Sequence, residues 1–253
     1  MKIIKILPFT FLFLFTACAE LAQIAQQTLE ESQGQSLTRT EIVAGLKEAL
    51  VVGTNKSVDI LGVTDGYYKD EMAKILLPPE AGMIVDNVSK IPGGQKLVED
   101  VLLRINRAAE DAVSEAKPIF VNSIKSMTIT DAIGILRGAD NAATHYLHNT
   151  TYNQLFALYR PKIKASVDKK LVGNVSTGQS WDLLTGKWNE VANSMVGKVA
   201  GFKPVEIDLD EYLTQKALDG LFLKIENQEK LIREDPAARV TDILKRVFGS
   251  VSS

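Results

Sequence analysis

The chain has 253 residues, of which 29 are basic and 31 acidic, so its formal net charge at pH 7 is −2. This balance argues against a nucleic-acid partner, because proteins that bind nucleic acids carry a basic face. Aromatic residues make up only 7% of the chain, so a core would be built mainly from leucine, isoleucine, valine and alanine, a mixture that suits helices.

The chain begins with the parts of an export signal. A basic start with Lys2 and Lys5 precedes an apolar run over residues 6–15, and two small residues end the segment. The apolar run is too short to cross a hydrocarbon core, which takes about 20 residues. We therefore predict a signal peptide over residues 1–17, which is removed, rather than a permanent transmembrane helix.

Cys18 follows this segment directly and is the only cysteine of the chain. A small residue just before a cysteine resembles the lipobox of bacterial lipoproteins, in which the cysteine is acylated and becomes the first residue of the mature chain. The alternative is an ordinary buried cysteine, but Cys18 precedes every segment with the pattern of a folded element. The resemblance implies that Cys18 is the lipidation site, and several acyl chains hold a protein firmly on a membrane.

The residue after the cysteine bears on location. It is Ala19, where an aspartate would resemble the inner-membrane retention signal of such lipoproteins. The resemblance therefore implies an outer-membrane protein, anchored by its lipid and facing the periplasm. With its one thiol acylated, the mature chain can form no disulfide even in an oxidising compartment.

Residues 18–36 are polar and rich in Gln and Glu, which predicts an acylated N-terminus followed by a tether. A helical domain is expected over residues 37–249, with residues 250–253 as a C-terminal tail. Thr38 and Glu41 have the spacing of a capping box, so the first helix is predicted to begin at Thr38.

Glycine and proline interrupt the first part of the domain. Gly53 is expected to interrupt the first helix, and helical spacing weakens over residues 62–94, where turn residues cluster. Short helices are expected there at 69–75 and 80–90. Residues 95–116 then predict a long amphipathic helix, because their apolar residues form one stripe.

The middle of the domain is predicted as a series of shorter helices. Pro118 is placed at the start of a helix, and Thr128 begins a capping box for the next. Asp140 is expected to cap a helix that Pro161 bends or stops. A further helix is expected at 162–172.

The last third is also predicted to be helical. Residues 173–180 are expected to form a loop and residues 181–201 an amphipathic segment with both tryptophans on its apolar side. An extended stretch then leads to a cap at Asp208 or Asp210, from which a helix runs to about Glu234.

Asp235 and Pro236 are predicted as the N-cap and first residue of the last helix, which Gly249 closes. No internal repeat occurs and strand patterns are nearly absent. The sequence therefore predicts an all-α fold, with a single compact multi-helix domain behind the signal peptide and tether.

No strong catalytic or metal-binding motif is found. His145 and His148, the only histidines, have the spacing of metal ligands on a helix, but a zinc site needs further ligands and no H-E-x-x-H sequence occurs. The common nucleophile-elbow, phosphate-loop and dinucleotide motifs are also missing. We therefore predict neither a metal site nor a cofactor.

One segment is a candidate binding surface. Residues 138–146 combine a glycine break with a helix N-terminus, which favours an anionic group such as a carboxylate or phosphate. We expect this segment to lie beside the helix that carries residues 106 and 107. The alternative is structural, with Asp140 capping its helix and Arg107 paired with Asp111. The candidate binding residues are Asn106, Arg107, Asp140, Thr144 and Tyr146.

Five segments support a family resemblance: "IVAGLKEAL", "NRAAEDAVSEAKPIF", "GADNAATHYL", "ALDGLFLKIENQEKLIRED" and "RVTDILKRVFG". In this order they resemble the bacterial family catalogued as domain of unknown function 4197, over about residues 37–249. The resemblance implies a helical exported protein without an assigned activity, and it carries over no catalytic residues. The family pattern G-x-D-x-A-A-T-x-Y leaves the positions of both histidines open.

The leading functional hypothesis is a non-enzymatic outer-membrane lipoprotein that binds an envelope protein or an apolar small ligand. The alternative is a hydrolase-type enzyme with a polar cleft around Arg107, Asp140 and Tyr146. Convergent carboxylates with shifted pKa values in a pocket would favour the enzyme. A dry apolar cavity would favour a protein that binds hydrophobic ligands. An exposed apolar patch would favour an interaction module.

Overall fold

The computed structural model of the protein describes residues 38–251, with side chains to residue 249. Contacts along the chain divide it into residues 1–38 and residues 39–253, and the second unit is the helical domain. The predicted signal peptide, Cys18 and the whole of the predicted tether lie outside the described residues. Within them every regular element is a helix, apart from one isolated bridge between residues 172 and 175, which confirms the all-α prediction.

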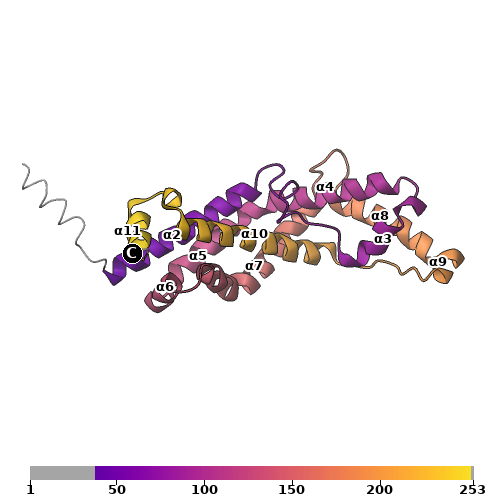
Figure 1. The fold of residues 1–253 in the computed structure, drawn as a ribbon. Helices are drawn as coiled ribbons and strands as arrows, with labels where there is room; N and C mark the ends of the chain where they lie inside the picture. The colour runs from indigo at the N-terminus through magenta and orange to yellow at the C-terminus, as the bar shows by residue number, and fades with distance from the viewer. Residues whose placement is uncertain (1–37, 252–253) are drawn as a thin grey trace, which may run out of the picture. The chain divides into compact units, whose positions relative to one another are not determined.

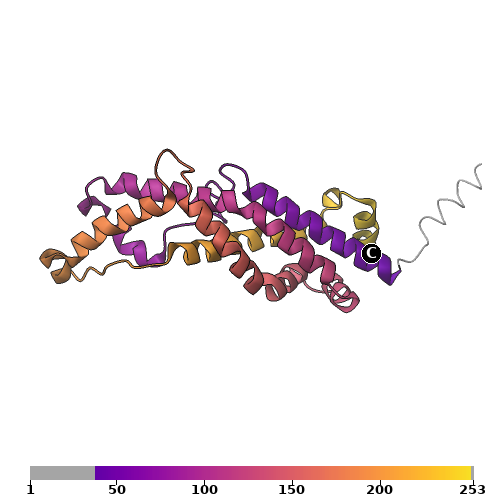
Figure 2. The same ribbon diagram turned by 180° about the vertical axis from the view of Figure 1, so that it is seen from behind.

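At the centre of the domain lie its three longest described helices, α2 (Arg39–Leu61), α7 (Ala142–Asp168) and α10 (Leu209–Glu234). The helix α10 packs along both α7 and α2, so the first and the last of the three long helices are neighbours (Figures 1 and 2). Shorter helices complete the domain: α3 (Gly82–Asp86), α4 (Gly94–Ala112), α5 (Lys117–Ser126), α6 (Ile129–Leu136), α8 (Thr177–Asn193), α9 (Met195–Val199) and α11 (Asp242–Val251).

Most of these shorter helices pack against the three central helices. The helix α4 lies between α7 and α8, while α5, α6 and α11 all contact α2. Four 3-10 turns connect helices, at Pro79–Ala81, Val88–Lys90, Val113–Ala116 and Pro236–Ala238.

The core is made of aliphatic side chains with a few large rings among them. The largest fully buried side chains are Trp188, Tyr67, Tyr159 and Phe120. The predicted stripe of α4 is buried at Val101 and Ile105, and three alanines beyond them allow neighbouring helices to approach closely.

Several predicted helix ends are confirmed. Thr128 forms its capping box with Asp131 at the start of α6, and Pro118 lies in the first turn of α5. Asp208 accepts a hydrogen bond from the Glu211 backbone N–H and so caps α10. These signals were readable because a cap is made within three or four residues of the chain.

Two predicted interruptions of helices are wrong. The helix α2 continues through Gly53 to Leu61, since Gly53 is buried in its interface with α10. The helix α7 continues through Pro161 to Asp168. The fully buried side chains of Tyr159 and Ile163 hold it in the core on both sides of the proline, so packing outweighs the lost backbone hydrogen bond.

The predicted helix at 69–75 is also absent. That segment forms turns, in which the Asp70 carboxylate accepts hydrogen bonds from the backbone N–H groups of Met72 and Ala73. The prediction of short helices at 80–90 is closer, because α3 and two 3-10 turns occupy that range.

Three boundaries near the C-terminal part differ from the prediction. The helix α8 begins at Thr177, because Ser176 and Gln179 form a capping box within the predicted loop. Asp235 caps the 3-10 turn and not α11, which begins at Asp242. Gly249 lies inside α11 and does not end it.

Among the described residues, no single helix is both long and apolar enough to cross a membrane. One bent pair, Gly94–Ser126 with Ile129–Leu136, meets the criteria of length and composition and turns by 103° at its break.

Candidate interaction surface

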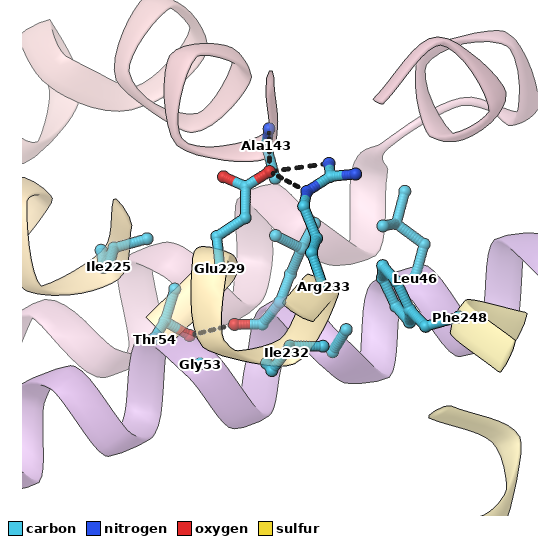
Figure 3. A pocket seen from close by; sticks show the side chains of 11 residues that line it. Leu46, Gly53, Thr54, Ala143, Ile225, Glu229, Ile232, Arg233 and Phe248 are labelled. Atoms are coloured by element: carbon cyan, nitrogen blue, oxygen red, sulfur yellow. Dashed lines mark hydrogen bonds and ion pairs between the residues drawn. The ribbon is translucent and has the colours of Figure 1, made fainter. Parts of the chain in front are cut away.

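The N-terminus of α7, where the sequence predicts an anion, is occupied by a carboxylate of the chain itself. The backbone N–H groups of Ala143 and Thr144 donate to Glu229 of α10 at 2.9 and 2.8 Å, and the Thr144 hydroxyl donates to it at 2.8 Å. Arg233 completes the site, with its Nε 3.0 Å and its Nη2 2.8 Å from the same carboxylate (Figure 3). Thr144 therefore serves the packing of α7 on α10.

Asp140 does not cap α7, contrary to the prediction. The N-cap position is Asn141, whose side chain makes no capping bond. Its amide donates instead to Glu226 of α10 at 3.1 Å, while Asp140 is exposed. The local signal failed because Glu229, distant in sequence, satisfies the first N–H groups of the helix.

Asn106 and Arg107 of α4 also bind other parts of the chain. Asn106 is fully buried, accepts from the Ile75 N–H at 2.8 Å and donates to the Ile75 carbonyl at 2.8 Å. Arg107 pairs with Asp65 and with Glu110, so the predicted pairing with Asp111 is wrong. Together they attach the segment that follows α2 to α4.

Charges in this region shift the titration of Asp65. The Lys69 ammonium and then the Arg107 guanidinium hydrogen-bond the Asp65 carboxylate and hold its pKa below the ordinary value. Glu110 is enclosed as well, since it accepts from the backbone N–H groups of Tyr67 and Tyr68 at 3.1 Å. These carboxylates are used in the fold.

The structure does not bring the candidate residues together. Asp111 of α4 accepts a hydrogen bond from Ser166, so this part of α4 faces the C-terminal half of α7. Thr144 lies 22 positions before Ser166 on the same helix, a distance of about 33 Å at 1.5 Å per residue. Residues 138–146 therefore do not lie beside Asn106 and Arg107.

Tyr146 is placed apart from them as well. Its hydroxyl donates to Asp131 of α6 at 3.4 Å, which is a long hydrogen bond. Burial and then the Asp131 carboxylate raise the pKa of Tyr146. The contact links α6 to α7.

Both histidines open onto a groove between α7 and α10. The groove has a volume of about 480 Å³, and Asp219, Glu226 and Phe222 line its other side. His148 stacks on Tyr152 at 4.7 Å between ring centres. Across the described part of the chain no group of three or more His, Cys, Asp or Glu side chains is placed to hold a metal ion.

An apolar cavity lies between α2, α10, α11 and the start of α7 (Figure 3). Leu46, Leu50, Ile225 and Phe248 are among its walls, and the Glu229–Arg233 pair lies at one side. Its volume is about 20 Å³, room for about one water molecule. This space is too small for a lipid or another hydrophobic ligand.

The short helix α9 carries the three most exposed large apolar side chains of the described residues. Met195, Val196 and Val199 are 84%, 77% and 86% exposed, the highest values among the large apolar residues of the described range. The residue that α9 buries is Gly197. The helix thus reverses the usual arrangement, in which the apolar side faces the core.

Hydrogen bonds at both ends hold α9 in this orientation. At its start the Ser194 hydroxyl accepts from the Gly197 N–H at 3.0 Å. At its end Gly201, with φ +73°, and Phe202 donate back to the carbonyls of Lys198 and Gly197, which is a Schellman motif. The apolar side chains are therefore presented on an ordered helix.

The segment after α9 is fastened to α8. The Trp188 indole donates to the Lys203 carbonyl at 2.9 Å, and its ring centre lies 5.1 Å from that of Phe202. The Asn189 side chain both accepts from and donates to the backbone of Val205. A groove of about 470 Å³ lies beside α9, and its lining includes Lys90, Glu190, Val191, Val196, Ala200 and Phe202.

Gly197→Ala should displace α9. A Cβ at this position would lie 2.7 Å from the Ala192 carbonyl oxygen and closer still to that of Val191. We expect a loss of about 1–3 kcal/mol in unfolding free energy, as for overpacked sites, with a change in Trp188 fluorescence. Chemical unfolding followed by both circular dichroism and fluorescence measures this.

Gly186→Ala on α8 is the matched control, because nothing lies within 4 Å of its added Cβ. Alanine should leave stability unchanged there or raise it by up to about 1 kcal/mol. Equal behaviour of the two variants would show that α9 is not held against α8 as described.

A family model decides what kind of chain this is. The model described as protein of unknown function (DUF4197) matches residues 36–249. The chain belongs to this family. No curated protein and no solved structure is significantly similar to this DUF4197 chain.

The match covers the helical domain of the DUF4197 chain and so includes α9. The sequence does not reveal α9 as a surface, because residues 181–201 form one amphipathic pattern with Trp181, Leu184, Trp188 and Val191 on its apolar side. Ser194, with ψ 162°, breaks that helix and turns the stripe outward. The serine cap followed by a glycine three residues later was the signal available.

Proposed function

We propose that this DUF4197 protein is a non-enzymatic interaction module of the bacterial cell envelope. In this proposal an acylated Cys18 anchors it to the outer membrane, and the helical domain faces the periplasm. The observation that carries the proposal is the ordered, exposed apolar surface of α9. An apolar surface that a fold holds in water by caps at both ends is typical of a contact site.

The arrangement of polar residues supports a non-enzymatic role. A hydrolase-type cleft would need Arg107, Asp140 and Tyr146 to converge. Arg107 of α4 pairs with Asp65, whereas Tyr146, near the start of α7, contacts Asp131 of α6. Arg107 and the carboxylates around it are used in hydrogen bonds that hold the fold.

Cys18→Ser should abolish acylation, since Cys18 is the only thiol in the chain. Cells fed a labelled fatty acid should incorporate it into the natural protein but not into the variant. Ala17→Gly, which keeps a small residue before the cysteine, should retain the label. Persistent labelling of the Cys18→Ser protein would disprove the lipid anchor.

Photocrosslinking tests the interaction surface in cells. A photoreactive amino acid at Val199, which is 86% exposed, should give light-dependent adducts with an envelope component. The same amino acid at Leu158 of α7, which is 51% exposed, is the control and should give none. Without a Val199-specific adduct, α9 is not an interaction surface.

A further inference from the structure

The size of the α9 surface argues against a stable protein interface. Three side chains protrude from a five-residue helix, and together they expose far less than the ~800 Å² per partner of a standard protein–protein interface. Side chains exposed to this degree also project from the surface into solvent. A few projecting apolar side chains are suited to entering a soft, deformable medium.

The charges around α9 favour an anionic partner. Residues 194–204, "SMVGKVAGFKP", contain two lysines and no acidic residue. Both Lys198 and Lys203 are exposed, and the Lys90 ammonium lies 4.4 Å from the centre of the Phe202 ring. Glu190 is the one acidic residue that lines the adjoining groove. Apolar side chains flanked by lysines are the pattern of segments that bind anionic membrane surfaces.

The position of α9 leaves it accessible to such a surface. It lies at the end of the helical domain opposite to α11 and to the start of α2 (Figures 1 and 2). Of its residues, Gly197 is the one buried against the rest of the domain. Lysine side chains are long enough to reach lipid phosphates while neighbouring apolar groups enter the acyl region.

We propose that α9 is a membrane-contact element that inserts Met195, Val196 and Val199 into the interface of a bilayer containing anionic phospholipids. Lys198 and Lys203 contact the headgroups, and Phe202 with Lys90 lies at the same level. This inference rests on the proposed function and names the partner of its surface. It gives the domain a second membrane contact besides the lipid anchor.

A thiol-specific fluorophore tests the proposal on the full chain. Because Cys18 is acylated in the mature lipoprotein, Val199→Cys supplies a single reactive thiol for a nitrobenzoxadiazole label. The labelled protein is reconstituted into vesicles of phosphatidylcholine alone or of phosphatidylcholine with about 30 mol% phosphatidylglycerol. The second lipid gives the vesicles the negative surface of an anionic leaflet. We expect a blue shift and at least a ~3-fold rise in emission with the anionic vesicles, as apolar insertion predicts.

The insertion depth of the fluorophore is measured by the quenching that a spin-labelled lipid causes. This lipid is placed first in the vesicles that carry the protein and then in separate vesicles without protein. Quenching in either arrangement supports the proposal, and the arrangement that quenches shows whether α9 touches its own membrane or a facing one. Lys198→Glu combined with Lys203→Glu should remove most of the difference between anionic and neutral vesicles. Leu158→Cys, labelled in the same way, is the control that should remain in water.

Water-like emission from Val199→Cys in both arrangements would overturn the membrane contact. If adducts at Val199 still formed in cells, the interaction module would stand with a protein partner in place of lipid. Emission that rose with protein density but escaped lipid quenching would identify a second copy of the chain as the partner and also overturn the inference. Acylation of Cys18 is checked separately by the mass of the purified protein.

Discussion

Glu229→Ala is expected to lower the free energy of unfolding by about 3–5 kcal/mol, because removing one partner of a buried ion pair leaves the other charge uncompensated. Glu229 is 8% exposed and accepts from two backbone N–H groups at the start of α7, from the Thr144 hydroxyl and from Arg233. The variant would leave Arg233 and both N–H groups without this acceptor. Chemical unfolding followed by circular dichroism measures the loss.

Glu226→Ala, one turn earlier on α10, is the matched control. Its carboxylate accepts one hydrogen bond in this region, from Asn141 at 3.1 Å, and the side chain is half-buried. A single partly exposed hydrogen bond contributes about 0.5–1.5 kcal/mol. Similar losses for the two variants would show that Glu229 does not hold α7 against α10.

Asn106→Ala should cost about 2–6 kcal/mol, since it leaves the buried N–H and carbonyl of Ile75 unpaired, each at roughly 1–3 kcal/mol. Asn106 is fully buried, and both bonds to Ile75 are 2.8 Å long. Native-state hydrogen exchange should show the effect locally, as a loss of protection at the Ile75 amide that exceeds the global change.

Two variants sharpen this test. Asn106→Asp keeps an acceptor for the Ile75 N–H but loses the donor to its carbonyl, so it should remain destabilised. Asn122→Ala removes an exposed amide on α5 and should change stability by no more than about 0.5 kcal/mol. Unchanged exchange at Ile75 in Asn106→Ala would refute the described attachment.

The sequence was sufficient for features that are decided within one turn of the chain. The Thr128 capping box and the Asp208 cap are examples, because donor and acceptor lie three residues apart. Gly53 and Pro161 were misread for the opposite reason. Their local preference for a break is outweighed by contacts with α10 and the core, which no local pattern reveals.

The candidate site shows the same limit. Asn106 and Thr144 were predicted as binding residues, and both are buried. A buried polar group needs a partner, but the sequence does not say whether that partner is a ligand or the chain itself. The partner of Thr144 is Glu229, 85 residues away, and that of Asn106 is Ile75, 31 residues away.

The packing of α2 on both α10 and α11 has a consequence for the order of folding. A chain that emerges N-terminus first, from a ribosome or through a translocation channel, presents α2 before either of its late partners exists. The side chains of Leu46 and Leu50, buried in the finished domain beside Ile225 of α10 and Phe248 of α11, then lack the cover that these two helices supply. Folding must wait for residues near the C-terminus, because contacts this distant in sequence form only after a long loop closes. A chain shortened before α10 would therefore expose apolar surface of α2, which makes such a fragment prone to aggregation.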